Sequence, residues 1–344
     1  MGADPRFYRL AGPVTAGALA ERVSGRVVGD TERAITNVAA AGQAGGSDLY
    51  FLSSEPGALT SASGVAIVAD DALAARLAEA GASVIVHPGP KAAYAEAVTS
   101  FLSLKTHAGP DRIDAEAEIA GAAVIGPGAV VGAGARIDAH AEIGANAVIG
   151  PGVQIGAGSR IGAGAVIQCA IIGARCEIAA GVVIGESGFG LAYHEGEVVS
   201  LPHVGRVLIE DEVTLGANVT VDRGMFSDTV LKRGCRIDNL SHVAHNVVVG
   251  ERAVMAAFAG ISGSVTIGTG AQFGGRVGVA DHLAIGDGAR LAADAAVMRD
   301  VPAGETWAGS PAQPIQRFMR ETAWVRRESG RPRRKPKPQE GDGT

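Results

Sequence analysis

The chain has 344 residues, of which 47% are hydrophobic, 4% are aromatic and 50 are glycine. This hydrophobic content excludes a disordered chain, and glycine does not recur at every third position as a collagen helix requires. The formal net charge of −6 gives no general reason to expect nucleic acid or an anionic membrane surface as a partner.

Targeting features and cysteines indicate a soluble, cytoplasmic protein. The N-terminus, MGADPRFYRL, lacks the basic stretch followed by an apolar core that marks a signal peptide. No run of about 18 apolar residues free of turn formers is present to span a bilayer. Cys169, Cys176 and Cys235 are odd in number and form no CxxC motif, so we expect neither a disulfide framework nor a thiolate zinc site.

Residues 1–105 predict a small α/β domain, because helix-like and strand-like stretches alternate there. The expected helices are 16–23, 71–80 and 92–101, and the expected strands are 65–69 and 84–86. Residues 106–112, THAGPDR, form the expected linker to the next domain.

From Ile113 onward a branched aliphatic residue recurs every six positions, without a break as far as Ile167. The frame slips by one residue at Ile172 and later runs unbroken from Leu231 to Val297. Neither helix amphipathicity, with a period of about 3.6, nor simple strand alternation gives this period. It predicts a parallel β-helix over residues 113–302. The pattern resembles the left-handed kind, a triangular prism with three six-residue steps per coil, which gives about nine coils stacked roughly 4.8 Å apart.

The repeat ends at Pro302, and residues 303–344 predict a C-terminal extension. Residues 313–327 are expected to form a capping helix, followed by a basic tail. From Arg317 onward there are nine lysines and arginines against four acidic residues. This excess of positive charge is a candidate docking site for an acidic protein partner, and a solubilising tail is the alternative.

One stretch of the repeat, RIDNLSHVAHNVVVG at residues 236–250, is unusually polar. Gly263 follows His245 by one full coil and should therefore stack on it, and His282 should lie on the same edge of the prism. Asp238 precedes His245 by seven residues, which we expect to be close enough for its carboxylate to bind one imidazole nitrogen. His242, three residues before His245, either takes part in the site or only caps a turn.

A histidine oriented by a carboxylate, next to a free backbone N–H at Gly263, is a base beside an oxyanion donor. This arrangement suits acyl transfer from a thioester to a neutral nucleophile. Because no cysteine or serine with its own base is found, we expect direct attack by the acceptor and no covalent acyl-enzyme.

At these residues the chain resembles the UDP-3-O-(3-hydroxyacyl)glucosamine N-acyltransferases of bacterial lipid A synthesis. The stretches that carry the resemblance are IGESGFGLAYHEGEVVSLPHVGRVLIEDEVTLGANVTVDRG, CRIDNLSHVAHNVVVG and GSVTIGTGAQFGGRVGVADHLAIGDGA. The resemblance implies a left-handed β-helix and a homotrimer with active sites between adjacent prisms. There a 3-hydroxyacyl chain would pass from acyl carrier protein to the 2-amine of UDP-3-O-acylglucosamine, with no cofactor beyond the carrier's phosphopantetheine.

The resemblance also implies roles for single residues. His245 matches the family's general base, Asp238 its orienting carboxylate and Gly263 its oxyanion donor. His282 matches a second active-site histidine near the sugar nucleotide, and Phe51 an aromatic residue that stacks on uracil. Further residues expected at the substrate are Ser54, where the family commonly has Asn, Asn239, and His242, where it usually has Gln.

Two further implications concern the substrate's ends. The loop from Gly185 to Arg206 would close over the sugar. Small residues between the prisms would leave room for the acyl chain; the candidates are Ala256, Ala257, Ala259, Ala292 and Ala296.

Two other enzyme classes use the same prism. A trimeric zinc hydratase similar to gamma carbonic anhydrases would use His242, His245 and His282 as ligands, but the spacing of the first two differs from that family's. An acetyl-CoA-dependent sugar acetyltransferase would share the fold and the base but not the N-terminal domain.

Overall fold

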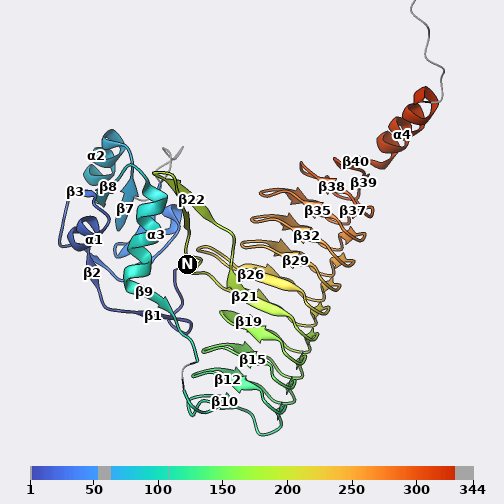
Figure 1. Cartoon of the computed structure of the whole chain (residues 1–344), viewed down its shortest axis with the longest axis horizontal. Helices are drawn as coiled ribbons and strands as arrows, with labels where there is room; N and C mark the ends of the chain where they lie inside the picture. The colour runs from blue at the N-terminus through green and yellow to red at the C-terminus, as the bar shows by residue number, and fades with distance from the viewer. Residues whose placement is uncertain (1, 53–62, 108, 330–344) are drawn as a thin grey trace, which may run out of the picture.

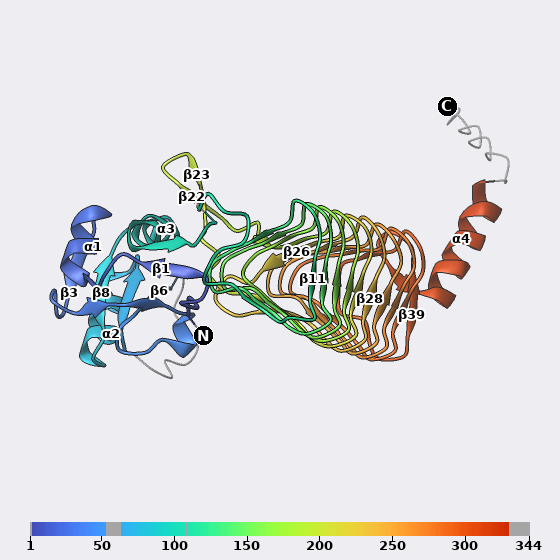
Figure 2. The ribbon, with the colours of Figure 1, turned by 90° about the horizontal axis from the view of Figure 1, so that it is seen from below.

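The computed structural model describes residues 2–52, 63–107 and 109–329, which form an N-terminal α/β domain, a long prism of stacked coils and a C-terminal helix (Figure 1). Figure 2 shows the coils nested behind one another, with the N-terminal domain beside the prism and helix α4 beyond its last coils. The predicted order of α/β domain, β-helix and C-terminal helix is therefore the observed one.

The N-terminal domain is built on a five-stranded sheet in the order β3-β8-β7-β6-β5. Its strands are β3 Arg26–Val28, β8 Ser83–Val86, β7 Val65–Val68, β6 Asp48–Phe51 and β5 Asn37–Val38. Smaller elements are β1 Tyr8–Leu10 paired with β9 Leu102–Leu104, β2 Val14–Thr15 paired with β4 Ala34–Ile35, and the 3-10 turn η1 Ala41–Gln43. All four residues of β7 are buried, as expected for a central strand covered on both faces.

Three helices pack around this sheet: α1 Ala16–Arg22, α2 Asp71–Glu79 and α3 Pro90–Phe101. Their starts follow from the sequence. The Thr15 side chain accepts a hydrogen bond from the Ala18 N–H, and Asp70 accepts one from Leu73, so each caps its helix. Pro90 occupies the first turn of α3, where its missing N–H leaves no bond unmade.

The prism has three faces, each a sheet whose neighbouring strands come from successive coils and pair in parallel, except that β40 pairs antiparallel with β39 at the end of the second face. The first face contains β10 Glu118–Ile119, β13 Arg136–Ile137, β16 Gln154–Ile155, β19 Ala170–Ile172, β24 Val207–Ile209, β27 Thr229–Leu231, β30 Val248–Val249, β33 Thr266–Ile267 and β36 Ala284–Ile285. The second contains β11 Val124–Ile125, β14 Glu142–Ile143, β17 Arg160–Ile161, β20 Glu177–Ile178, β25 Thr214–Leu215, β28 Arg236–Ile237, β31 Val254–Met255, β34 Gln272–Phe273, β37 Arg290–Leu291, β39 Thr306–Ala308 and β40 Gln313–Pro314. The third contains β12 Val130–Val131, β15 Val148–Ile149, β18 Val166–Ile167, β21 Val183–Ser187, β26 Thr220–Arg223, β29 His242–Val243, β32 Gly260–Ile261, β35 Gly278–Val279 and β38 Ala296–Val297.

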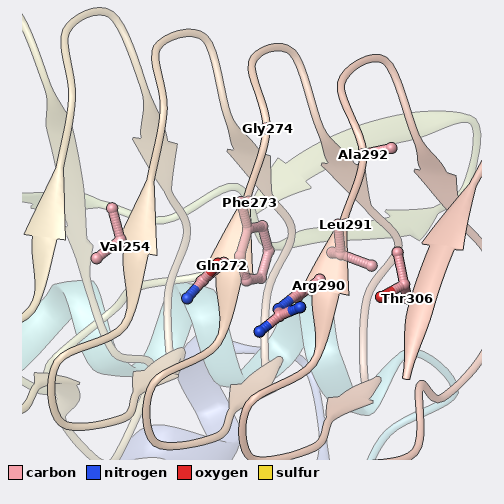
Figure 3. Close-up of a pocket in the computed structure, with 8 residues that line it drawn as sticks. All are labelled: Val254, Gln272, Phe273, Gly274, Arg290, Leu291, Ala292 and Thr306. Atoms are coloured by element: carbon pink, nitrogen blue, oxygen red, sulfur yellow. The ribbon is translucent and has the colours of Figure 1, made fainter. Parts of the chain in front are cut away.

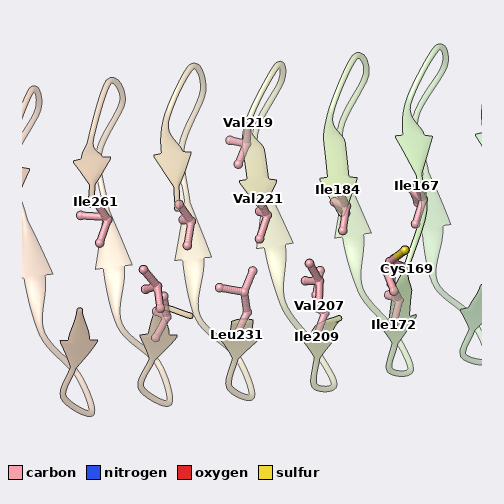
Figure 4. Close-up of a cluster of buried hydrophobic side chains, with 14 of the residues drawn as sticks. Ile167, Cys169, Ile172, Ile184, Val207, Ile209, Val219, Val221, Leu231 and Ile261 are labelled. Atoms are coloured by element: carbon pink, nitrogen blue, oxygen red, sulfur yellow. The ribbon is translucent and has the colours of Figure 1, made fainter. Parts of the chain in front are cut away.

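The prism is the left-handed parallel β-helix that the family resemblance implies, and the stacking of its coils follows from the six-residue period. Val243 pairs with Ile261, one coil later, and both are fully buried. The stacked aliphatic side chains fill the inside of the prism (Figure 4). Two of the three faces contain nine strands each, in agreement with the predicted nine coils.

The predicted slip of one residue is a shortened coil. Ile155 pairs with Ile172, so this coil is one residue shorter than the others and the aliphatic residues still stack. The corner before Ile172 absorbs the missing residue: Cys169 takes the left-handed conformation with φ 47° there, and its side chain is buried near Ile167 (Figure 4).

The segment expected to be a loop, 185–206, contains a β-hairpin of β22 Leu191–His194 and β23 Glu197–Ser200. Its Ala192 packs with Leu201 against Ala92 and Ala95 of α3. The hairpin therefore joins the prism to the N-terminal domain. An alternating pattern of four residues is too short for periodicity alone to separate it from a loop.

The β-helix extends beyond residue 302, its predicted end, because β39 pairs in parallel with β37. Helix α4 Ile315–Ser329 follows, close to the predicted 313–327, and none of its residues is buried. Among the helices within the described ranges, none has both the length and the apolarity needed to span a bilayer.

We expect the inward aliphatic residues to determine the stability of the prism. Replacing Ile137, which is 1% exposed, with alanine should lower the free energy of unfolding by about 2–5 kcal/mol, because it leaves a cavity. The matched control Val124→Ala, on an outward side chain that is 59% exposed, should change it by less than about 0.5 kcal/mol. Thermal and denaturant unfolding followed by circular dichroism measures both; equal losses would contradict the inward placement.

Candidate active site

His245 lies at the corner that follows β29, where the third face of the prism turns into the first. The ring of His203 meets the His245 ring edge-on, with centroids 4.8 Å apart and an interplanar angle of 63°. A Cβ built on Gly188 would lie 2.7 Å from Cδ2 of His245, and one built on Gly263 would lie 2.7 Å from its Nε2. Backbone without side chains therefore packs against the imidazole from two directions.

An amide fixes the tautomer of His245. Its Nδ1 lies 3.1 Å from Oδ1 of Asn246, the next residue. That Oδ1 also accepts a hydrogen bond from the Met225 N–H, while Nδ2 of Asn246 donates to Oγ of Ser227. Because these partners set the orientation of the amide, Nδ1 of His245 must carry the proton and donate it to Oδ1. The lone pair of Nε2 is left available to act as a base.

The expected stacking of Gly263 on His245 is observed. The N–H of Ser264 donates to the carbonyl of His245, which places the two corners one coil apart. Within the described residues, nothing accepts a hydrogen bond from the Gly263 N–H. A basic nitrogen and an unused backbone donor are thus neighbours, as acyl-transfer chemistry requires.

The prediction that Asp238 reaches His245 within one chain is wrong. Asp238 follows β28 and lies at the corner between the second and third faces, whereas His245 lies at the next corner. Seven residues exceed the six-residue step along one face, so they carry the chain past β29. Oδ1 of Asp238 accepts hydrogen bonds from the backbone and side chain of Asn239, and Oδ1 of Asn239 accepts one from the Ala217 N–H. Both side chains brace their own corner.

A different carboxylate, Asp222, lies at the corner of His245. Val221 pairs with Val243, so Asp222 at the end of β26 is one coil before His245. Its Oδ2 lies 3.6 Å from Nε2 of His242, whose Nδ1 is 2.8 Å from Oγ1 of Thr220. Burial raises the pKa of Asp222 to about 6, although the nearby His245 opposes the shift. Burial also lowers the pKa of His242, so its partial enclosure disfavours the charged form.

His203, between β23 and β24, is a buried and neutral neighbour of the base. Its Nδ1 donates to the Leu201 carbonyl, and no described residue hydrogen-bonds its Nε2. Burial, reinforced by the charge of His245, lowers the pKa of His203 to about 4. The His203 carbonyl accepts hydrogen bonds from the Tyr8 hydroxyl and from Nε of Arg223, which hold this residue in place.

His282 lies on the predicted edge but does not contact His245. Its N–H donates to the Gly263 carbonyl, so it is in the coil after Gly263. It stacks with Asn246 and Ser264, and all three take left-handed φ values between 58° and 61°. The His282 side chain is 76% exposed, so its role toward a substrate stays a prediction.

Phe51 lies at the junction of the two domains. Its ring centroid is 5.0 Å from that of Tyr94 and 6.2 Å from that of Phe226, which belongs to the prism. It is only half-buried, and its stacking on uracil stays a prediction. Ser54 lies outside the described residues.

Two open pockets lie on the second face, whereas His245 lies at the corner between the third and first faces. One, of about 490 Å³, is bordered by Gln272, Arg290 and Ala292 (Figure 3). The other, of about 390 Å³, includes Asp238 and Ala256. Of the small residues expected to leave room for an acyl chain, Ala259 does not qualify, because its 1% exposure places it inside the prism.

The three histidines of the hydratase alternative do not form a cluster. Across the described ranges, no group of three or more His, Cys, Asp or Glu side chains is arranged to hold a metal ion.

Three residues of the site had weak or no signals in the sequence. Asn246 had the clearest signal, since it directly follows His245 and lies one coil before Ser264, which is also at a corner. Asp222 was visible only as part of DRG at 222–224. His203 lies in the insertion at 185–206, where the repeat gives no register.

A protein-family model matches two stretches of the prism. The family model described as bacterial transferase hexapeptide (six repeats) matches residues 136–169 and 228–263. The second range contains both His245 and Gly263.

Relatives match along nearly the whole chain. The UDP-3-O-acylglucosamine N-acyltransferase of Maricaulis maris (strain MCS10) is 48% identical over 335 residues, which cover 94% of this chain and 96% of the relative. The protein of the same name from Caulobacter sp. (strain K31) is 44% identical over 331 residues, covering 95% and 97%. Among solved structures, LpxA from Acinetobacter baumannii is similar over 62% of this chain and 78% of its own, with 25% identity and a TM-score of 0.48.

The lowered pKa of His203 predicts how stability depends on pH. The unfolded chain binds a proton at His203 below about 6.5 and the folded protein only below about 4, so stability is lost as the pH falls through this window. The loss has an upper bound of about 3 kcal/mol. His203→Gln should remove this part of the dependence, so its Tm should fall less than that of the wild type between pH 7.5 and pH 4.5. The control His140→Asn, at an exposed corner, should show the same fall in Tm as the wild type. If the Tm of His203→Gln also falls as much as that of the wild type, His203 is not held neutral by burial.

Proposed function

The chain belongs to the UDP-3-O-acylglucosamine N-acyltransferase family and is an acyltransferase, and we propose that it moves a 3-hydroxyacyl chain from acyl carrier protein to the 2-amine of UDP-3-O-acylglucosamine. The observation that carries this proposal is that Nε2 of His245, whose other ring nitrogen carries the proton, lies beside the Gly263 N–H, which has no acceptor among the described residues. Family membership favours acyl transfer over the zinc hydratase.

In the proposed reaction, His245 acts as the general base. As the amine nitrogen attacks the thioester carbonyl, its proton passes to Nε2. The C–N bond forms, the C–S bond breaks, and the proton then goes from Nε2 to the departing sulfur. Nδ1 of His245 keeps its proton throughout and donates it to Oδ1 of Asn246 as a hydrogen bond. Only Nε2 therefore exchanges protons. A base in this position contributes about 10²–10⁴-fold to the rate.

Gly263 is the proposed oxyanion donor. Its N–H has no acceptor among the described residues, so it is available to the thioester oxygen as negative charge develops there. The glycine is needed for space as well, since a Cβ would contact the imidazole at 2.7 Å. Such a donor typically contributes about 3–4 kcal/mol to transition-state stabilisation.

The proposed assembly is a homotrimer with an active site between adjacent prisms. Within one chain, His282 is 76% exposed and the second-face pocket that includes Asp238 is open, so both surfaces are accessible to a second copy. In this arrangement Asp238 would act across the interface on a neighbouring subunit. Phe51 and the hairpin of β22 and β23 would serve the sugar-nucleotide end.

Acyl carrier protein is the proposed donor, and helix α4 is the proposed docking surface. Arg326 and Arg327 lie in its last turn, and Met319, Trp324 and Val325 are more than half exposed. A basic helix with exposed apolar side chains suits an acidic carrier protein. We propose that the reaction takes place in the cytoplasm, without a bound cofactor.

An N-acylation assay tests the proposal. Purified wild-type protein, given 3-hydroxyacyl-acyl carrier protein and UDP-3-O-acylglucosamine, should form the N-acylated product, and His245→Ala should lower kcat by about 10²–10⁴-fold. The control His140→Asn changes an exposed residue in the left-handed conformation, which asparagine tolerates, and should keep full activity. Full activity in His245→Ala would sink the mechanism, and transfer from acetyl-CoA but not from the acylated carrier would establish the acetyltransferase alternative.

A further inference from the structure

We propose that Asp222 is the carboxylate within the chain that stabilises the protonated form of His245 during acyl transfer, and that His242 holds Asp222 in position. Asp222 is then a positioning residue that acts through the base. The inference rests on the proposed function, because it concerns the charge that the base acquires in that reaction.

The geometry follows from three neighbouring strands of the third face. Strand β26, which ends with Asp222 and Arg223, lies between β21 and β29. Val221 points into the prism, so Asp222 points outward at the corner where His245 lies one coil later. On the neighbouring coil, Nε2 of His242 is 3.6 Å from its carboxylate. The carboxylate therefore lies beside His242 and one coil before His245.

The Asp222 carboxylate lowers the stability of the folded state where it lies. Its side chain is only 13% exposed, and no described residue donates a hydrogen bond to it. A buried carboxylate without hydrogen bonds destabilises a fold unless it becomes protonated or acquires a positively charged partner. Perturbed carboxylates of this kind concentrate at functional sites.

The charged groups around Asp222 do not offset the destabilisation caused by burying its carboxylate. Glu186 of β21 pairs with Asp222 across the strands and, as a second acid, raises its pKa. Arg223, next along β26, lowers the pKa, but its guanidinium is already bonded to the carbonyls of His203 and Gly185. The pKa of His242 is itself lowered by burial. Of the facing groups, His245 is the base that becomes positively charged in the proposed reaction.

Asn246 and Asp222 would then have separate tasks. The Asn246 amide holds the Nδ1–H of His245, which sets the tautomer but supplies no charge. Asp222 supplies the negative charge and receives no proton, because the proton on Nε2 goes to the departing sulfur. Burial raises the pKa of Asp222 to about 6, so the carboxylate is available above that pH and is lost below it.

The test is Asp222→Asn in the full-length protein. Its kcat should fall about 10–100-fold with KM nearly unchanged, because the imidazolium loses its counter-charge, and the acid limb of the kcat profile should lose the contribution that titrates near pH 6. The control Asp138→Asn removes a carboxylate that pairs with Arg136 elsewhere on the prism and should leave kcat unchanged.

Stability separates this role from a structural one. The folded-state pKa of Asp222 lies above its unfolded value of 3.8, so stability is lost as the pH rises through the window from about 4 to about 6. Asp222→Asn should therefore have a higher Tm than the wild type at pH 8 and an equal one near pH 4. Lower activity together with higher stability at pH 8 supports the proposal.

Two results would overturn it: a kcat within twofold of the wild type, or a Tm that falls at both pH values together with the activity. Where Asp222→Asn does not fold, Asp222→Ala assayed with and without millimolar formate replaces it. Formate should raise kcat by restoring a carboxylate, and no increase over a chloride control contradicts the inference. Absence of N-acylation by the wild type would instead count against the proposed function.

Discussion

The stacking of inward aliphatic side chains from one coil to the next is the constraint on which the rest of the structure depends. Each coil places its branched residues directly on those of the coil before, as Val221, Val243 and Ile261 show on the third face. Backbone hydrogen bonds between coils then fix the separation of corner residues at about one strand spacing. The neighbourhood of His245 and Gly263 is a consequence of this stacking, because no insertion lies between them.

The same constraint explains which parts of the site could be predicted from the sequence. The stack of His245 and Gly263, the common edge with His282 and the shortened coil at Ile172 all follow from counting along the repeat. The prediction for Asp238 failed because a short distance along the chain is not a short distance in the prism. One face takes six residues, so two residues that are seven apart lie at successive corners. Counting also fails in the insertion at 185–206, where His203 is positioned by packing of the hairpin on α3.

Some of the polar groups around His245 lower the stability of the folded protein. Nε2 of His203, which has no hydrogen-bond partner among the described residues, and the largely buried carboxylate of Asp222 are both unfavourable in the folded state at neutral pH, and such violations are expected at functional sites. The N-terminal domain contributes to holding them. Arg206 bridges Asp4 and Asp228, and the Tyr8 hydroxyl bonds the His203 carbonyl. The small α/β domain therefore supports the base as well as lying beside it.

In the proposed reaction, Nε2 of His245 takes the proton of the amine while the Gly263 N–H donates to the thioester oxygen, and both need a residue without a side chain at position 263. Gly263→Ala tests this requirement most directly. The added methyl group must displace the imidazole, since its Cβ would lie 2.7 Å from Nε2. A displacement of that kind typically costs about 100-fold in rate. The account predicts a loss of this size in N-acylation kcat at an unchanged Tm, while Gly121→Ala, whose Cβ meets nothing within 4 Å, keeps full activity. A Gly263→Ala enzyme with kcat within twofold of the wild type would contradict it.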